Sequence, residues 1–598
     1  MYLFFGYTQL KNMLKSFISN KKENWEILFV ILLFIFLWAY LFIRANTVFY
    51  VHDEIVTKWS YMVSWNPQPY HGYIDANNHF LNSFFGGIFI RLFQSDSMWI
   101  VRFANLLAFP LFYWSIFGLR NFFRKRINFY WLLISLTCSA FIIEFFGMAR
   151  GYGISIALMV FAIQQTLVFF KKVKINHFIA SIFAWILAVY ANLTLIPIAI
   201  LGLTYLGFFL WKENLRKWIM AIILLVFPLG YAIKYSFYLK QIGKLYLGGQ
   251  DGFIKITLHS LTKYLWNVEN LLFDSLLLIL TLLILFTIIW DLLKSKNFYE
   301  AKIVFSLFFI FGLCNILLQN YLLGINFPED RAAVYLVIFF LGGLCFTIDY
   351  WRIGKLAFPF ILLNLVLFGS HFNLKKFIIF DYEHFDIELL TKLPDQVKGI
   401  PPSTGDPRSW AMVSDELTRL NNLPLRAMQL ANLPSDTLED YIITREQSRP
   451  DIFNLYHPIH KDEISQLTLF ERNYFLSRTK IKETFLQIDG ANEYNNLYNE
   501  DLGKALFLRC SGFLEEMNIH KNAILIFCAE DSISDNNIYY QGVDLTKSCF
   551  IEESGIINFD FTFTMNEYIE ANQIKVYLWN NKKIKLKGGI KLEVYEIS

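Results

Sequence analysis

The chain has 598 residues, of which 55% are hydrophobic and only 17% are charged, and its formal net charge is +4. Because soluble proteins carry about 25% charged residues, this composition excludes an ordinary water-soluble protein. The small net charge gives no basis for nucleic-acid binding, so nucleic acid is not expected as a partner.

Long apolar runs, separated by short charged clusters, occupy residues 25–371. A membrane-spanning helix needs about 20 mostly apolar residues, so the pattern predicts a transmembrane domain at 1–371 with about eleven helices. The first run is too long for a signal peptide and lacks a small-residue cleavage site, which predicts an uncleaved span. The expected spans are 25–44, 98–119, 128–147, 152–170, 177–191, 194–211, 217–236, 270–292, 303–322, 332–349 and 355–371.

Basic residues mark one side of the predicted membrane domain. With eleven spans, the Lys and Arg clusters near residues 11–22, 120–126, 171–174, 212–217, 294–296 and 352–355 all fall on the same side. The positive-inside rule assigns this side to the cytoplasm. We therefore expect a multi-pass protein of the cell (inner) membrane, with a cytoplasmic N-terminus and an extracytoplasmic C-terminal domain.

The remainder of the chain has the composition of a globular protein and divides into two predicted domains. Residues 372–478 alternate strand-like runs, such as 377–380, 440–444 and 467–471, with helical stretches, which predicts an extracytoplasmic α/β domain. Short alternating runs separated by turns at 479–598 predict an extracytoplasmic β-sandwich domain. This part holds Cys510, Cys528 and Cys549, and their spacing leaves open whether two of them pair.

Adjacent acids open the first outer loop, at Asp53 and Glu54. A solvated loop and a general base or metal ligand are equally compatible with such a pair. Further along the loop, Asp75 and His79 are spaced i, i+4, so on a helix they would share a face and could position a substrate or a cation. A plain interfacial helix explains that spacing as well.

Two arginines lie on the side that the basic clusters avoid. Arg150 stands in the segment Met148-Ala149-Arg150-Gly151-Tyr152, and Arg331 follows Glu329 and Asp330. Either guanidinium can snorkel to lipid phosphates or bind a substrate phosphate, for which its planar fork is suited. A salt bridge to a neighbouring acid is the alternative for Arg331.

These residues, in this order, resemble the GT-C superfamily of membrane glycosyltransferases, in particular the protein O-mannosyltransferases and the lipid A aminoarabinose transferases. The resemblance covers about residues 25–370 and rests on Asp53-Glu54, Asp75 with His79, Arg150 with Tyr152, and Arg331. The chain departs from it in having no His-Pro-Pro at the second motif and Ala332 after the late arginine.

The resemblance implies that a sugar passes from a polyprenyl-phosphate donor to an extracytoplasmic glycan, lipid or protein acceptor, with inversion. Asp53 would be the base with Glu54 beside it, Arg150, Tyr152 and Arg331 would bind the donor phosphate, and Asp75 and His79 would position the substrate. A divalent metal ion is the one cofactor that the resemblance leaves open. A polysaccharide ligase or polymerase and a lipid or polysaccharide transporter are alternatives, but neither explains an acidic first outer loop. A catalytically inactive scaffold that displays the soluble domain is a third alternative.

Overall fold

The computed structural model describes residues 21–598 with gaps, and the longest gap covers 417–437. The other gaps are 71–73, 214, 246–247, 296, 394–402, 405–410, 414, 439, 446–453, 502–504, 518–522, 532, 534–535, 546–554 and 566–570. The contacts within the chain divide it into two compact units. One unit consists of Met1–Val48 and Asp75–Ile378, and the other of Phe49–Ile74 and Ile379–Ser598. The predicted domain boundaries at 371 and 478 stay predictions.

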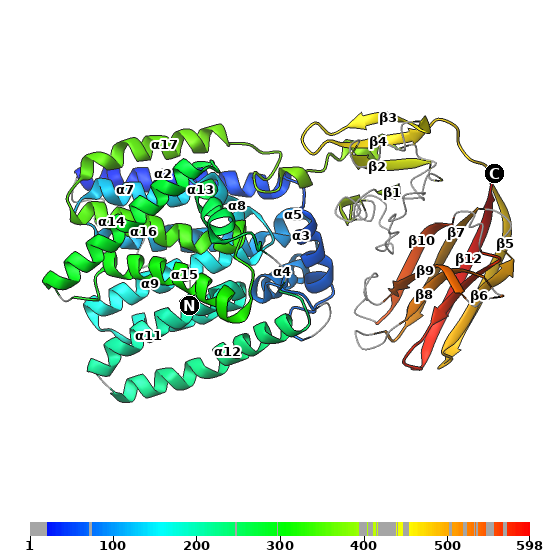
Figure 1. The fold of residues 1–598 in the computed structure, drawn as a ribbon, viewed down its shortest axis with the longest axis horizontal. Helices are drawn as coiled ribbons and strands as arrows, with labels where there is room; N and C mark the ends of the chain where they lie inside the picture. Colours follow the sequence, from blue (N-terminus) through cyan, green and yellow to red (C-terminus); the bar gives the residue numbers. More distant parts are fainter. Residues whose placement is uncertain are drawn as a thin grey trace. The chain divides into compact units, whose positions relative to one another are not determined.

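The first unit is helical, and its long helices run roughly along a common direction (Figure 1). Its main helices are α2 (Lys21–Thr47), α4 (Phe80–Phe93), α5 (Met98–Val101), α6 (Phe103–Gly118), α7 (Arg126–Thr137), α8 (Ala140–Glu144), α9 (Gly151–Lys172), α10 (Ile175–Ala191), α11 (Ile196–Glu213), α12 (Leu215–Gln241), α13 (His259–Trp266), α14 (Leu271–Ser295), α15 (Ala301–Leu323), α16 (Val334–Tyr350) and α17 (Ala357–Ser370).

Six helices among the described residues are long and apolar enough to cross a membrane. A seventh span results if α7 and the segment Ala140–Gly147, which meet at a 51° bend, are taken as one. Ser139 explains the bend, because its Oγ accepts a hydrogen bond from the Ile142 amide and begins a new helix there. The prediction of a multi-pass helical membrane region is confirmed, whereas the count of about eleven stays a prediction.

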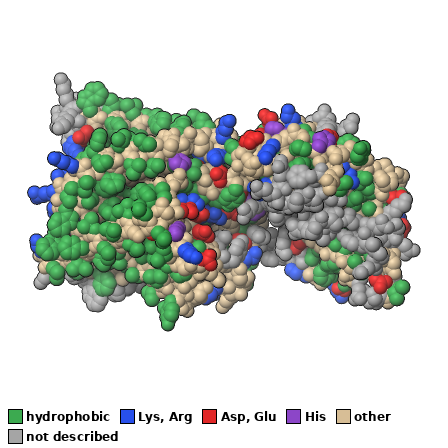
Figure 2. Space-filling view, turned by 45° about the horizontal axis from the view of Figure 1, so that its top comes forward, with side chains coloured by type: hydrophobic (Ala, Val, Ile, Leu, Met, Phe, Trp, Pro, Cys, Tyr) green, Lys and Arg blue, Asp and Glu red, His purple; other side chains and the backbone are tan. Residues whose placement is uncertain are grey.

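The helices differ in how deeply they are buried within the unit. α9 and α16 are buried along most of their length, whereas α2 and α14 expose much of theirs. The exposed side chains of α14 are apolar and include Leu278, Ile279 and Leu282. Figure 2 shows hydrophobic side chains over much of the visible surface of this unit, Lys and Arg side chains along its left edge, and charged side chains of both signs toward its other end. This is the surface that a lipid-embedded protein presents.

The second unit begins with the short helix α3 (His52–Thr57) and the π-helix Lys58–Val63. Lys58 donates to Asp415 at 2.9 Å in a buried ion pair, which ties this segment to residues far along the sequence. A four-stranded sheet follows in the order β1 (Ser403–Thr404), β2 (Tyr441–Arg445), β4 (Leu467–Arg472), β3 (Tyr456–Lys461).

The strand expected at 377–380 is absent, because the first part of this segment is a loop of the first unit held by side chains. The Ile378 amide donates to both carboxylate oxygens of Glu144, at 2.9 and 3.0 Å, and the guanidinium of Arg44 lies over the ring of Phe377. A run of apolar residues predicts burial here correctly, but it does not separate a strand from a buried loop.

The C-terminal part of the second unit consists of two four-stranded antiparallel sheets. One has the order β10 (Ile557–Met565), β7 (Leu506–Glu515), β12 (Leu586–Ile597), β5 (Arg478–Gly490), and the other β6 (Tyr494–Asp501), β11 (Gln573–Trp579), β8 (Ile524–Asp531), β9 (Asn536–Asp544). Buried residues of both sheets, such as Leu508, Ile590, Phe527 and Val576, form one hydrophobic cluster. The prediction of a C-terminal β-domain is confirmed.

Cysteines 510 and 528 are buried within this β-domain. Cys528 carries a thiol whose sulfur lies 2.9 Å from Asn537 Oδ1. Burial raises the pKa of this thiol to about 11, so it is a poor nucleophile at neutral pH. Cys549 lies outside the described residues, so the question of a disulfide stays a prediction.

Candidate functional site

A polar turn leads into α4 at one end of the helical unit. Asp75, Asn77, Asn78 and His79 are all buried. The Asn77 amide donates to Asp75 Oδ1 at 2.9 Å, and Ser83 Oγ donates to Asn78 Oδ1 at 2.9 Å. The expectation that Asp75 and His79 share a helical face is wrong, because the Asp75 carboxylate closes a turn and α4 begins only after His79.

Arg150 packs against this turn from the start of α9. It is 2% exposed, and its Nη2 donates to Asn77 Oδ1. Its guanidinium lies 5.8 Å from the centroid of the Tyr152 ring, which contacts the His79 ring edge to face at 4.7 Å. His79 Nδ1 lies 2.9 Å from the carbonyl oxygen of Ala191. The structure therefore brings His79, Arg150 and Tyr152, which are far apart in sequence, into one cluster.

Gly151 permits this close packing between the start of α9 and its neighbours. A Cβ atom there would lie 2.0 Å from the Ala191 carbonyl oxygen and 2.6 Å from His79 Cβ. Any larger residue would push α9 away from the end of α10 and from His79. The glycine between Arg150 and Tyr152 is thus a packing requirement of the cluster.

A chain of hydrogen bonds between buried amides joins the three helices α4, α6 and α9 next to the cluster. Asn82 of α4 donates to the Ala149 carbonyl oxygen at 2.9 Å and accepts from Asn105 of α6 at 2.8 Å. Asn105 Oδ1 in turn accepts from the amide of Ile154 in α9 at 3.2 Å. Buried amides are costly unless they are satisfied, so this chain of hydrogen bonds specifies how α4, α6 and α9 meet.

The loop after α12 adds a second cation. Lys244 Nζ lies 3.4 Å from Asp75 Oδ2, and its side chain is 36% exposed whereas that of Asp75 is 4% exposed. No sequence motif singles out Lys244. The one available signal is that the loop after α12, which is predicted to lie on the same side of the membrane as Asp53 and Glu54, is itself basic.

Arg331 lies in a short 3-10 helix before α16, next to α13. The neighbouring Asp330 forms an ion pair with Lys263 of α13 at 3.7 Å. Burial raises the pKa of Tyr264 in α13 well above its ordinary value, the charge of Asp330 raises it further, and that of Arg331 lowers it. Arg331 therefore acts electrostatically on Tyr264.

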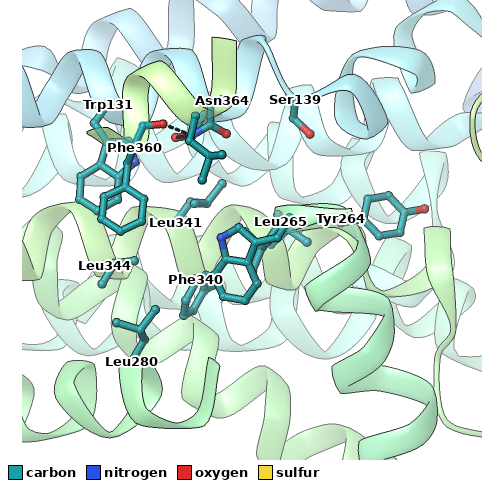
Figure 3. A pocket seen from close by; sticks show the side chains of 14 residues that line it. Trp131, Ser139, Tyr264, Leu265, Leu280, Phe340, Leu341, Leu344, Phe360 and Asn364 are labelled. Atoms are coloured by element: carbon teal, nitrogen blue, oxygen red, sulfur yellow. Dashed lines mark hydrogen bonds between the residues drawn. The ribbon is translucent and has the colours of Figure 1, made fainter. Parts of the chain in front are cut away.

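Neighbouring aromatic rings connect Tyr264 to the cluster around Arg150. The Tyr264 ring lies 6.3 Å from the Phe145 ring at 16°, and the Phe145 ring lies 5.3 Å from that of Tyr152. Tyr264 also lines a cavity that runs between α7, α14, α16 and α17, with apolar walls and the Trp131 and Phe360 rings at the far side (Figure 3). The cavity has a volume of only about 30 Å³, so it is a small packing void between the helices.

Asp53 and Glu54 lie in α3, which belongs to the second unit. Glu54 is fully buried, and its Oε2 accepts a hydrogen bond from the Val51 amide at 3.2 Å. The Asp53 side chain is 22% exposed and lies 3.8 Å from His52 Nδ1. The two acids therefore differ in environment: Glu54 stabilises the start of α3, whereas Asp53 has access to solvent.

Metal ligands do not gather in the described part of the chain. No three His, Cys, Asp or Glu side chains are placed there to hold an ion. The divalent cation stays a prediction.

The sequence matches no protein-family model and no curated protein. Among the solved structures that it resembles are ArnT from Cupriavidus metallidurans bound to undecaprenyl phosphate and the same protein in the apo state. Each is 10% identical with a TM-score of 0.36, covering 75% of this chain and 98% of that chain. Another is the arabinosyltransferase EmbB from Mycobacterium smegmatis, 9% identical with a TM-score of 0.33, covering 94% of this chain and 64% of that chain. Similarity at this level carries no argument about the chemistry of this chain.

Proposed function

We propose that this chain is a membrane glycosyltransferase that moves a sugar from a polyprenyl-phosphate donor to an extracytoplasmic acceptor. The observation that carries the proposal is the buried Arg150, held between Asn77 and Tyr152 at the same end of the helical unit as Lys244. A fully buried guanidinium costs much free energy, so its place at a polar cluster favours a binding role over a surface anchor.

The cations suit a lipid-linked phosphate. Arg150 and Arg331 present planar forks that match phosphate oxygens, and Lys244 adds a mobile point charge. The leaving group of the proposed reaction is a polyprenyl phosphate, whose developing negative charge such groups stabilise.

Asp53 is the proposed general base. A base must reach the acceptor hydroxyl, and Asp53 is the accessible acid of the pair, whereas Glu54 is engaged in capping α3. A single displacement with one base inverts the configuration at the anomeric carbon. Asp75 and His79 are proposed to hold the donor sugar. Asp75 is itself fixed by the hydrogen bond from the Asn77 amide, and His79 by its contact with the Tyr152 ring.

The membrane topology belongs to the same proposal. About eleven spans, the shorter apolar helices included, place the C-terminal domain, proposed as a β-sandwich, outside the cytoplasm. A reporter fused after Ser598 that is active only outside the cytoplasm is expected to give a signal. Activity of a reporter that works only in the cytoplasm would refute this orientation.

The decisive experiment measures transfer and donor binding separately. Purified protein in lipid nanodiscs is incubated with radiolabelled polyprenyl-phosphate sugars and acceptor extracts. Asp53→Asn removes the base, so we expect transfer to fall by about 100- to 10,000-fold with donor affinity retained. Glu54→Gln is the matched control and should cost less. Near-normal transfer by Asp53→Asn would refute the base assignment.

A second pair of variants tests phosphate binding. Arg150→Lys keeps the charge but loses the fork, so donor affinity should fall while the melting temperature holds. Arg91→Lys, at the far end of α4, is the matched control. Unchanged donor affinity would refute the role of Arg150. Movement of an intact lipid-linked glycan across the membrane, without cleavage of the phosphate–sugar bond, would favour a transporter.

A further inference from the structure

A charged pocket lies at the opposite end of the helical unit from the Arg150 cluster. It has a volume of about 430 Å³ and includes Lys171, in the last turn of α9, the helix that Arg150 precedes. A helix rises 1.5 Å per residue, so the 22 residues of α9 separate the two sites by about 33 Å. This pocket cannot belong to the transfer site.

The acidic side chains that line this pocket are engaged by protein groups. Asp349 accepts hydrogen bonds from the amides of Arg124 and Lys125, at 2.7 and 2.9 Å, and from Asn128 at 3.0 Å. Glu300 forms an ion pair at 2.9 Å with Lys302, which also pairs with Asp291 at 2.8 Å. Both carboxylates of the lining therefore have partners within the protein.

Two basic side chains of the pocket have a different environment. Lys171 Nζ donates to the Asn121 carbonyl oxygen at 3.3 Å and lies 3.8 Å from the Phe122 ring centroid. Arg124 Nη1 donates to the Tyr350 carbonyl oxygen at 3.4 Å, and its guanidinium lies over the Tyr350 ring. Within the described residues, no carboxylate forms an ion pair with either cation. Their charge is thus available to an anion in the pocket.

We propose that this pocket binds the phosphate headgroup of an anionic phospholipid. It lies at the basic end of the unit, which the positive-inside rule assigns to the cytoplasmic leaflet, where anionic lipids gather. Phe170, Phe209 and Tyr299 add aromatic walls on which the glycerol and upper acyl segments can pack. Its volume falls in the range of small-molecule sites, about 300–1,000 Å³.

The test is lipid binding by the full-length protein in neutral detergent, followed by native mass spectrometry. Phosphatidylglycerol is titrated against phosphatidylcholine, and inorganic phosphate and glycerophosphate are the soluble probes. The double variant Arg124→Gln/Lys171→Gln should weaken phosphatidylglycerol binding by about tenfold or more. The matched double variant Lys172→Gln/Lys174→Gln, at exposed positions outside the pocket lining, should change it less than about twofold.

Each other outcome would overturn the proposal. Equal weakening by both double variants would assign the effect to general surface charge. Equal binding of phosphatidylcholine would remove the selectivity for an anionic headgroup, and binding of the soluble phosphates alone would assign the pocket to a soluble ligand. If the double variant is poorly folded, the single variant Lys171→Gln serves, and unchanged lipid binding by a folded single variant would also refute the site.

Discussion

Glu144 provides a sharp test of how the end of the helical unit near Ile378 is held together. Its carboxylate lies 2.6 Å from Arg44 Nη2, and both side chains are 1% exposed. The same carboxylate accepts both hydrogen bonds from the Ile378 amide. Glu144→Gln preserves shape but replaces one acceptor oxygen by an NH₂ group, which must face either a cation or an N–H donor.

The size of the effect follows from burial. Removing one partner of a buried ion pair costs about 3–5 kcal/mol, because the remaining charge is uncompensated. Arg44 keeps its hydrogen bonds to the carbonyl oxygens of Asn373 and Lys376, at 2.6 and 2.9 Å. We therefore expect the lower end, about 3 kcal/mol, which corresponds to a roughly 100-fold larger unfolded fraction.

Denaturant-induced unfolding of the purified protein in detergent measures this loss, with intrinsic tryptophan fluorescence as the signal. Glu26→Gln is the matched control, because Glu26 pairs with Arg120 at 3.0 Å and with Arg126, and all three side chains are at least about one-fifth exposed. Exposed pairs contribute about 1 kcal/mol or less, so this variant should unfold almost like the parent. Equal losses in the two variants, or no loss in Glu144→Gln, would refute the assignment of a buried structural ion pair.

Two further predictions concern packing and pH. Gly151→Ala should destabilise the protein by about 1–3 kcal/mol, because the added Cβ would overlap the Ala191 carbonyl oxygen. Gly230→Ala is the control: its Cβ would meet no neighbour, so it should be neutral or stabilising. Thermal melts of both variants measure the difference. Burial raises the pKa of Asp462, but hydrogen bonds from His384 and other groups outweigh it and hold this pKa below its ordinary value. The stability that Asp462 contributes is therefore present above about pH 4 and is lost as the pH falls through its lowered folded pKa. Asp462→Asn should therefore reduce the loss of stability with falling pH in acid unfolding experiments. An unchanged pH dependence would contradict this.

Much of this protein could be predicted from its sequence for a direct physical reason. Bilayer crossing depends on the length and polarity of single segments, so the helical membrane region follows from local composition. The β-domain follows from alternation, as in β11, whose residues Ile574, Val576 and Leu578 are buried and separated by partly exposed ones. Such features need no knowledge of distant contacts.

Only the tertiary structure decided which polar residues act together. The spacing of Asp75 and His79 predicts a shared helical face, yet a hydrogen bond from the Asn77 amide to the Asp75 carboxylate makes a turn instead. Long-range packing brought Arg150 to Asn77 and Lys244 to Asp75, and no sequence pattern encodes those distances. Adjacent acids look equivalent in sequence, but folding buries Glu54 and leaves Asp53 accessible, because burial depends on what packs against a residue and not on its type.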